Sequence, residues 1–255
     1  MSIMRKAGLT VYSYMFWIFF AITSLVYFVI AEVIWLITKL FDRRLLIHQI
    51  WSCYWASSYI FFNPLWRVRV SGRNKIPWRR PCILVANHQS MVDILVLFLL
   101  FRPFKWISKK ENFSIPIIGW HMRISGHIEL ERGRNYSLVK LMEKASDNIR
   151  KGNSLMIFPE GTRYPGEKLG PFKDGAFRMA LEGKVDIIPI VIEGTAKALP
   201  KKGAILTGFT KINVKVLDPI PYSSFEGKPV RELMHEVRDI MSEEYDHMHS
   251  KNTSI

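Results

Sequence analysis

Two short segments of the sequence carry side chains suited to proton transfer and anion binding. The first segment, residues 87–93, directly follows the apolar run 82–86. In it His88 precedes Asp93 by five positions. A carboxylate that bonds one imidazole nitrogen fixes the tautomer and raises the basicity of the other nitrogen. The pair therefore has the composition of a general base and its orienting group. The same spacing also arises when a histidine merely caps a helix near an unrelated acid.

The second segment, residues 158–163, ends another apolar run with Glu160, Gly161, Thr162 and Arg163. Gly161 permits close approach of the backbone, and the guanidinium of Arg163 suits a phosphate or a carboxylate. The alternative is a polar turn with a solvated arginine. In α/β sheets, reactive groups collect at the carboxyl ends of strands. We therefore expect both segments at one sheet edge, as parts of an enzyme's site.

Short apolar runs alternate with amphipathic stretches from about residue 66 onward. The predicted strands are residues 66–70, 83–86, 105–108, 127–130, 155–158, 187–192 and 211–217. The predicted helices are residues 91–101, 136–151, 175–183 and 229–247, and residues 243–255 resemble a loose polar tail. The last strand lacks a clear preceding crossover helix, so strand directions should be mixed. The predicted fold class is α/β, with a mixed twisted sheet flanked by helices.

The N-terminal part of the chain is apolar. Residues 7–31 carry no charged side chain, which is sufficient length for a membrane-spanning helix. A second uncharged run, residues 45–66, is rich in tryptophan and tyrosine, which prefer the headgroup level. We predict a two-helix membrane hairpin over residues 1–66, followed by an α/β domain over residues 67–255. Spanning and one-leaflet arrangements both stay open, because the loop between the runs is positively charged.

Charge and cysteine content limit the binding partners and the kinds of site that the sequence supports. Lys and Arg number 36 against 22 Asp and Glu, which gives a net charge of +14. Combined with the apolar N-terminus, this favours a bilayer with anionic lipids over nucleic acid. Two cysteines cannot form a disulfide framework. His121 and His127 lack a matching ligand set, so no metal site is expected.

The two segments resemble the first and third blocks of the glycerolipid acyltransferases, in particular the PlsC-like 1-acylglycerol-3-phosphate O-acyltransferases. The second block resembles residues 126–132, which end in Arg132, and the fourth resembles residues 187–192. Lys109 and the segments 115–119 and 172–176 also fit the family pattern. The resemblance covers about residues 70–221, with all blocks in order.

This resemblance implies a glycerol-3-phosphate acyltransferase-like fold and a reaction. An acyl chain would pass from acyl-CoA or acyl carrier protein to the sn-2 hydroxyl of lysophosphatidic acid, giving phosphatidic acid. His88 would act as general base oriented by Asp93, and no cofactor would be needed. The substrate-binding residues implied are Lys109, Arg132, Glu160, Gly161, Thr162 and Arg163, with Glu160 binding a glycerol hydroxyl or holding Arg163. Ser90 would begin or cap the following helix rather than serve as a nucleophile.

Two alternatives remain open at this point. One is an acyltransferase for another acceptor, such as glycerol 3-phosphate or a different lysophospholipid. The other is a non-catalytic membrane-binding protein, against which the presence of both segments argues. Because no eukaryotic targeting signal is evident, we expect attachment to a bacterial cytoplasmic membrane, with the α/β domain facing the cytoplasm.

Overall fold

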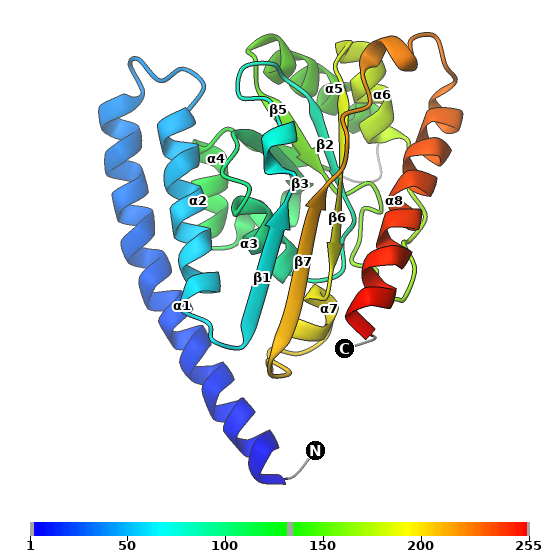
Figure 1. Ribbon diagram of the computed structural model, residues 1–255. Helices are drawn as coiled ribbons and strands as arrows, with labels where there is room; N and C mark the ends of the chain where they lie inside the picture. Colours follow the sequence, from blue (N-terminus) through cyan, green and yellow to red (C-terminus); the bar gives the residue numbers. More distant parts are fainter. Residues whose placement is uncertain (1–2, 132–134, 254–255) are drawn as a thin grey trace.

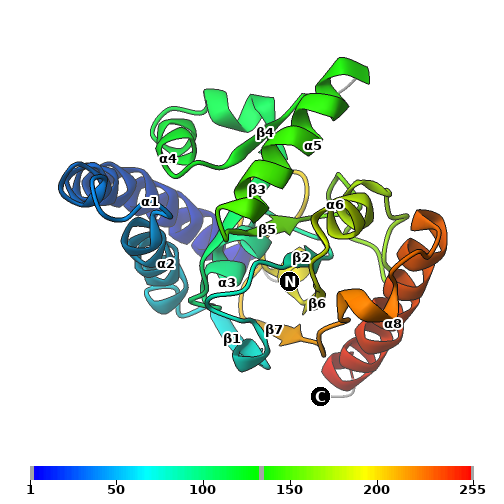
Figure 2. The same ribbon diagram turned by 90° about the horizontal axis from the view of Figure 1, so that it is seen from above.

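The computed structural model describes residues 3–131 and 135–253, which form a sheet with helices on both faces (Figures 1 and 2). The seven strands are β1 (Trp66–Ser71), β2 (Ile83–Ala86), β3 (Phe104–Lys109), β4 (Ile128–Leu130), β5 (Ser154–Ile157), β6 (Ile187–Glu193) and β7 (Thr210–Val216). Each overlaps a strand predicted from the sequence. Strands β2 and β6 are buried along their whole length, as is usual when helices cover a sheet on two sides.

The strands are arranged in the order β1-β7-β6-β2-β5-β3-β4. Neighbours are parallel except for β6 and β7, which are antiparallel. The predicted mixed sheet is therefore confirmed. Because β6, β2, β5, β3 and β4 all run the same way, their carboxyl ends share one edge of the sheet.

Helices cover both faces of the sheet and form a hydrophobic core on each. One core lies under α1 (Ile3–Thr38), α2 (Leu46–Phe61) and α3 (Val92–Phe98). The other lies under α5 (Asn135–Arg150), α6 (Gly175–Gly183) and α8 (Val230–Thr253). Figure 2 shows the two groups on opposite sides of the strands. The remaining helices are α4 (Ile118–Ile124), α7 (Thr195–Ala198) and the 3-10 turns η1 (Arg73–Lys75), η2 (Lys110–Ser114) and η3 (Tyr222–Ser224).

Helix α1 is the one helix in the described parts of the chain that is long and apolar enough to cross a membrane. Only 11% of its most apolar window is buried, so it is not a core helix of a soluble domain. Large apolar side chains such as Ile18, Ile22 and Val29 are exposed along it. This exposed surface supports association with a membrane.

Helix α2 has a different environment from most of α1. It packs beside α1 and against α3, and Cys53, Trp55 and Tyr59 belong to the same core as Leu84 and Val96. The core thus continues across residue 66. The predicted membrane hairpin and the predicted boundary at that residue both stay predictions.

The C-terminal tail predicted for residues 243–255 is wrong over most of its length. Helix α8 continues through Thr253, and Tyr245 and Met248 are buried against the sheet. Many polar side chains in this stretch hide the few apolar contacts that hold it. Helices α4 and α7 were also not predicted, because each is too short to show a helical period.

Candidate active site

The predicted base and its orienting group meet in the loop between β2 and α3. His88 Nδ1 lies 2.7 Å from Asp93 Oδ2. Because an ionised carboxylate only accepts hydrogen bonds, Nδ1 carries the hydrogen and the neutral ring keeps its free electron pair on Nε2. Nε2 is therefore the atom that can remove a proton.

The Asp93 carboxylate is fully buried and is held from two sides. Its Oδ2 also accepts the backbone N–H groups of Gln89 and Ser90, at 2.6 and 2.8 Å. Its Oδ1 accepts the hydroxyl hydrogen of Thr195, which begins α7 after strand β6. The orientation of Asp93 is thus fixed independently of the histidine that it orients.

A buried network extends from this loop to the last helix. Gln89 Nε2 donates a hydrogen bond to the hydroxyl of Tyr245 in α8, at 2.7 Å. The Tyr245 hydroxyl donates in turn to the carbonyl oxygen of Gly166, at 3.3 Å. No role for Gln89, Thr195 or Tyr245 was predicted. No local sequence signal marks Thr195 or Tyr245. Thr195 lies 102 positions from Asp93, and Tyr245 lies 156 positions from Gln89.

Asn87 completes the sheet at the point where β2 ends. Its Oδ1 accepts the backbone N–H of Ile192 at 2.7 Å, and its Nδ2 donates to the Ile192 carbonyl at 2.9 Å. The fully buried side-chain amide takes the place that a backbone peptide would have in the ladder with β6. The first residue of the loop that carries His88 is therefore anchored to the sheet.

The ring of His88 lies flat against Phe158. The ring centroids are 4.0 Å apart and the planes differ by 11°. Trp106 packs against the same phenylalanine, with centroids 5.4 Å apart. The imidazole is 14% exposed, so these contacts restrict its movement while part of it remains accessible.

Glu160 lies shortly after strand β5 and is buried. Its Oε1 accepts the backbone N–H of His88 at 3.1 Å. Burial raises the pKa of Glu160 to about 8, although the N–H groups of His88 and Gly170 oppose the shift. Glu160 Oε2 is buried and has no hydrogen-bond partner among the described residues.

Glu160 thus contacts the loop of His88, and no ion pair joins it to Arg163 among the described residues. This arrangement differs from the expectation that Glu160 holds Arg163. Its predicted contact with substrate stays a prediction.

The loop after Glu160 passes directly beside His88. Gly161 has a φ of +65°, which glycine adopts without strain, and Thr162 is exposed. The backbone N–H of Tyr164 donates to the His88 carbonyl at 2.7 Å. Half-buried Arg163 is therefore next in the chain to a residue bonded to His88. Lys201, which was not predicted, donates to the Arg163 carbonyl at 2.8 Å and adds a second positive charge.

Lys109 ends strand β3 at the same edge of the sheet. Pairing of Val85 with Ile157 and of Trp106 with Met156 places Lys109 level with Asn87 along the strands. Strand β5 lies between them, so the backbones are two strand spacings apart, about 10 Å. Arg132, the other predicted phosphate ligand, lies outside the described residues.

Ser90 is not available as a nucleophile. Its buried hydroxyl donates to the Leu199 carbonyl at 2.7 Å. Helix α3 begins at Val92, whose N–H approaches Ser90 Oγ at 3.4 Å. The Ser90 carbonyl also accepts the N–H of Asp93 at 3.2 Å, so Ser90 contributes to the helix start through its backbone.

The comparison with known proteins identifies the family. The acyltransferase family model matches residues 67–193, the part of the chain that contains His88, Asp93, Glu160 and Arg163. The chain belongs to the acyltransferase family. A 1-acyl-sn-glycerol-3-phosphate acyltransferase of Chlamydomonas reinhardtii is 40% identical over 192 residues, covering 73% of this chain and 56% of the relative.

Two further matches belong to the same acyltransferase family. A chloroplastic 1-acyl-sn-glycerol-3-phosphate acyltransferase of Brassica napus is 37% identical over 183 residues, which are 71% of this chain and 53% of the relative. The chain thus spans little more than half the length of these two relatives. The crystal structure of the 1-acyl-sn-glycerophosphate acyltransferase PlsC from Thermotoga maritima superposes with a TM-score of 0.73, at 25% identity and 96% coverage of both chains.

The acyltransferase match ends before several residues that support the site. Thr195, Lys201 and Tyr245 all lie beyond residue 193. The matched segment therefore supplies His88 and Asp93, whereas later elements hold the Asp93 carboxylate and the adjoining loops in place.

Proposed function

We propose that the chain transfers an acyl group from a thioester donor to the sn-2 hydroxyl of lysophosphatidic acid, giving phosphatidic acid. The observation that carries this proposal is the 2.7 Å bond between His88 Nδ1 and Asp93 Oδ2, which leaves Nε2 as a base. The algal and plant relatives are 1-acyl-sn-glycerol-3-phosphate acyltransferases, which supports this acceptor.

The proposed reaction needs no enzyme nucleophile. His88 Nε2 removes the proton of the acceptor hydroxyl while the hydroxyl oxygen attacks the thioester carbonyl carbon. The tetrahedral intermediate then collapses, the C–S bond breaks, and the imidazolium returns the proton to the departing thiolate. The products are the new ester and the free thiol of the donor. Asp93 stabilises the imidazolium between these steps and stays ionised throughout.

Basic residues near His88 support recognition of the acceptor phosphate. Arg163 offers a planar fork of N–H donors suited to phosphate oxygens, and Lys201 adds a charge to the same loop. Lys109 lies at the same edge of the sheet. We propose that Arg163 and Lys109 bind the phosphate, with Arg132 as a further ligand inferred from sequence alone.

The membrane supplies the acceptor and retains the product. Exposed apolar side chains of α1 support insertion into a bilayer, and residues 67–80, with six basic side chains and no acidic ones, support attraction to anionic lipids. We propose a bacterial cytoplasmic membrane with the α/β domain on the cytoplasmic side. Acyl-CoA and acyl carrier protein are both suitable donors.

The decisive experiment is an acyl-transfer assay on the detergent-solubilised full chain with lysophosphatidic acid and acyl-CoA. We expect robust turnover by the wild type and a loss of 100-fold or more, about the contribution of a general base, in His88→Ala and Asp93→Asn. His235→Ala, which changes an exposed histidine on α8, should retain full activity. Normal turnover by His88→Ala would exclude the mechanism.

The same assay distinguishes the acceptors and donors. Glycerol 3-phosphate and lysophospholipids with larger headgroups should react more slowly than lysophosphatidic acid at equal concentration. Faster reaction of any of them would overturn the acceptor assignment but leave the base mechanism intact. Replacing acyl-CoA by acyl carrier protein then decides the donor.

A further inference from the structure

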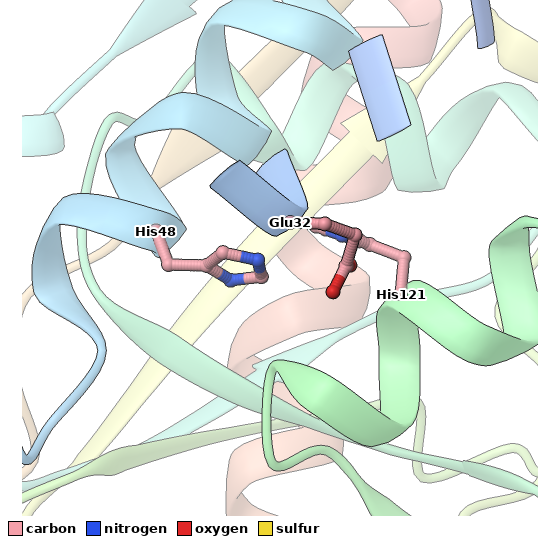
Figure 3. A group of neighbouring side chains, drawn as sticks. All are labelled: Glu32, His48 and His121. Atoms are coloured by element: carbon pink, nitrogen blue, oxygen red, sulfur yellow. The ribbon is translucent and has the colours of Figure 1, made fainter. Parts of the chain in front are cut away.

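A buried cluster of possible metal ligands lies away from the active site, between three helices. Glu32 comes from α1, His48 from α2 and His121 from α4, and Figure 3 shows their side chains converging. One ligand atom from each residue lies within 4.8 Å of the other two. The three residues are far apart in the sequence, so no spacing pattern reveals the ligand partners of His121.

Each of the three side chains has a buried polar atom without a hydrogen-bond partner. These atoms are Glu32 Oε1, His48 Nε2 and His121 Nδ1. His48 is completely buried and His121 is 8% exposed. A buried polar atom without a partner destabilises the fold, so the presence of three of them in one group calls for a ligand.

The hydrogen bonds of Ser52 define which nitrogen of His121 is free. The Ser52 hydroxyl donates its one hydrogen to the His48 carbonyl at 3.0 Å. Its oxygen, 2.9 Å from His121 Nε2, must then accept from that nitrogen. In the neutral ring Nδ1 is consequently an unprotonated electron pair directed into the cluster.

His48 is arranged in the same way. Its Nδ1 lies 3.3 Å from the hydroxyl of Ser125, which leaves Nε2 on the side of the cluster. Histidines that bind metals normally engage their second nitrogen in a hydrogen bond that fixes the ring orientation. Ser52 and Ser125 provide this support for both rings.

Charges around the cluster are mixed. Glu32 is the one acidic residue of α1, where a lone carboxylate is expensive without a cation. Lys105, buried and bonded to the Ser125 carbonyl at 2.8 Å, opposes a bound cation, and Asp42 offsets that charge. This balance favours moderate affinity for a metal ion.

We propose that Glu32, His48 and His121 bind a divalent transition-metal ion, with Zn²⁺ as the preferred ion. Two neutral imidazoles and one carboxylate form a set that suits zinc, and one position remains for water. Tetrahedral coordination with bonds of about 2.0–2.1 Å brings ligand atoms to about 3.3 Å from one another. Side-chain rotation therefore has to draw the three atoms together. The ion would link the apolar helix α1 to α2 and α4.

Titration of the full chain in detergent with Co²⁺ tests the site directly. The protein must carry no histidine tag and must be purified without chelators. We expect visible d–d absorption bands that saturate at one equivalent and disappear on addition of one equivalent of Zn²⁺. Zinc should also raise the melting temperature by mass action. Absence of a saturating band would overturn the proposal, whatever the activity of the enzyme.

Two cluster variants and two matched controls locate the ion. Glu32→Gln and His121→Gln should each weaken Co²⁺ and Zn²⁺ binding by at least about tenfold, because even residues that only support a ligand have effects of this size. Glu143→Gln and His235→Gln, both at exposed positions, should bind like the wild type. Glu32→Gln keeps the shape of the side chain, and its melting temperature without zinc reports whether it folds. Equal binding by folded cluster variants and wild type would place the ion elsewhere and contradict the proposal.

Discussion

The hydroxyl of Thr195 donates its hydrogen to Oδ1 of Asp93, the oxygen that does not contact His88. This bond ties the end of strand β6 to the first turn of helix α3. The two oxygens of one carboxylate are therefore fixed by different parts of the chain. Precise placement of the His88 imidazole therefore depends on the contacts of both carboxylate oxygens.

Removing this hydroxyl should slow the reaction while binding of acceptor is retained. We expect Thr195→Val to lower kcat by about tenfold, because a hydrogen bond to a charged group contributes about 1.5–3 kcal/mol. KM for lysophosphatidic acid should stay within about twofold. Thr195→Ser, which keeps the donor, should recover most of kcat. Equal rates for Thr195→Val and Thr195→Ser would show that the hydroxyl has no part in positioning Asp93.

Glu160 should make stability depend on pH. Burial raises its pKa from 4.5 to about 8, so between these values the folded state keeps a proton that the unfolded state has lost. The contribution of Glu160 to the free energy of unfolding is therefore complete below about pH 4.5 and decreases as pH rises toward 8. Glu160→Gln removes this dependence.

The measurement is the difference in melting temperature between Glu160→Gln and wild type at pH 5 and pH 8. We expect the difference to change in favour of the variant at the higher pH. An identical difference at both values would mean that Glu160 is ionised throughout the range. Exposed Glu143→Gln provides the control.

Arg163 should determine affinity for the phosphate of the acceptor. We expect Arg163→Ala to raise KM for lysophosphatidic acid by about tenfold or more, with KM for the acyl donor nearly unchanged. The KM of Arg163→Lys for lysophosphatidic acid should lie between the values of the wild type and Arg163→Ala, because lysine keeps the charge but lacks the planar fork of N–H donors. The control is Arg178→Ala, an exposed arginine paired with Asp174 on α6. Equal changes in both KM values would argue against a phosphate-specific contact.

Asn87 should matter for stability as well as for the site. Asn87→Ala leaves the N–H and carbonyl of Ile192 without partners, at a cost of about 2–4 kcal/mol in the free energy of unfolding. Chemical denaturation measures this loss against Asn74→Ala, which changes an exposed residue. A loss below about 1 kcal/mol would indicate that water replaces the amide.

The elements and the central pair were accessible from sequence because their signals are local. The strands are short runs that are either apolar throughout, as in β2, or alternate apolar with polar residues, as in β1 and β7. Asp93 follows His88 closely enough for the geometry to be inferred. Glu160 was placed at the correct edge for the same reason. Its contact with the His88 backbone was not foreseen, since it depends on how neighbouring strands align.

Long-range support of the site could not be inferred in this way. Tyr245 lies in a stretch whose polar composition resembles a disordered tail, and only the packing of α8 reveals its partner. Similarly, Glu32 and His121 come together because α1 and α4 pack side by side. A single sequence contains no periodic pattern that records such contacts.

The bond between Gln89 and Tyr245 has a consequence for synthesis of the protein. The two residues are 156 positions apart, so they can meet only after the ribosome has added that many residues beyond Gln89. By then α1 has long been available for insertion into lipid. We therefore expect the protein to reach the membrane before Tyr245 supports the loop of His88, and we expect nascent chains that lack α8 to show none of the proposed acyl transfer.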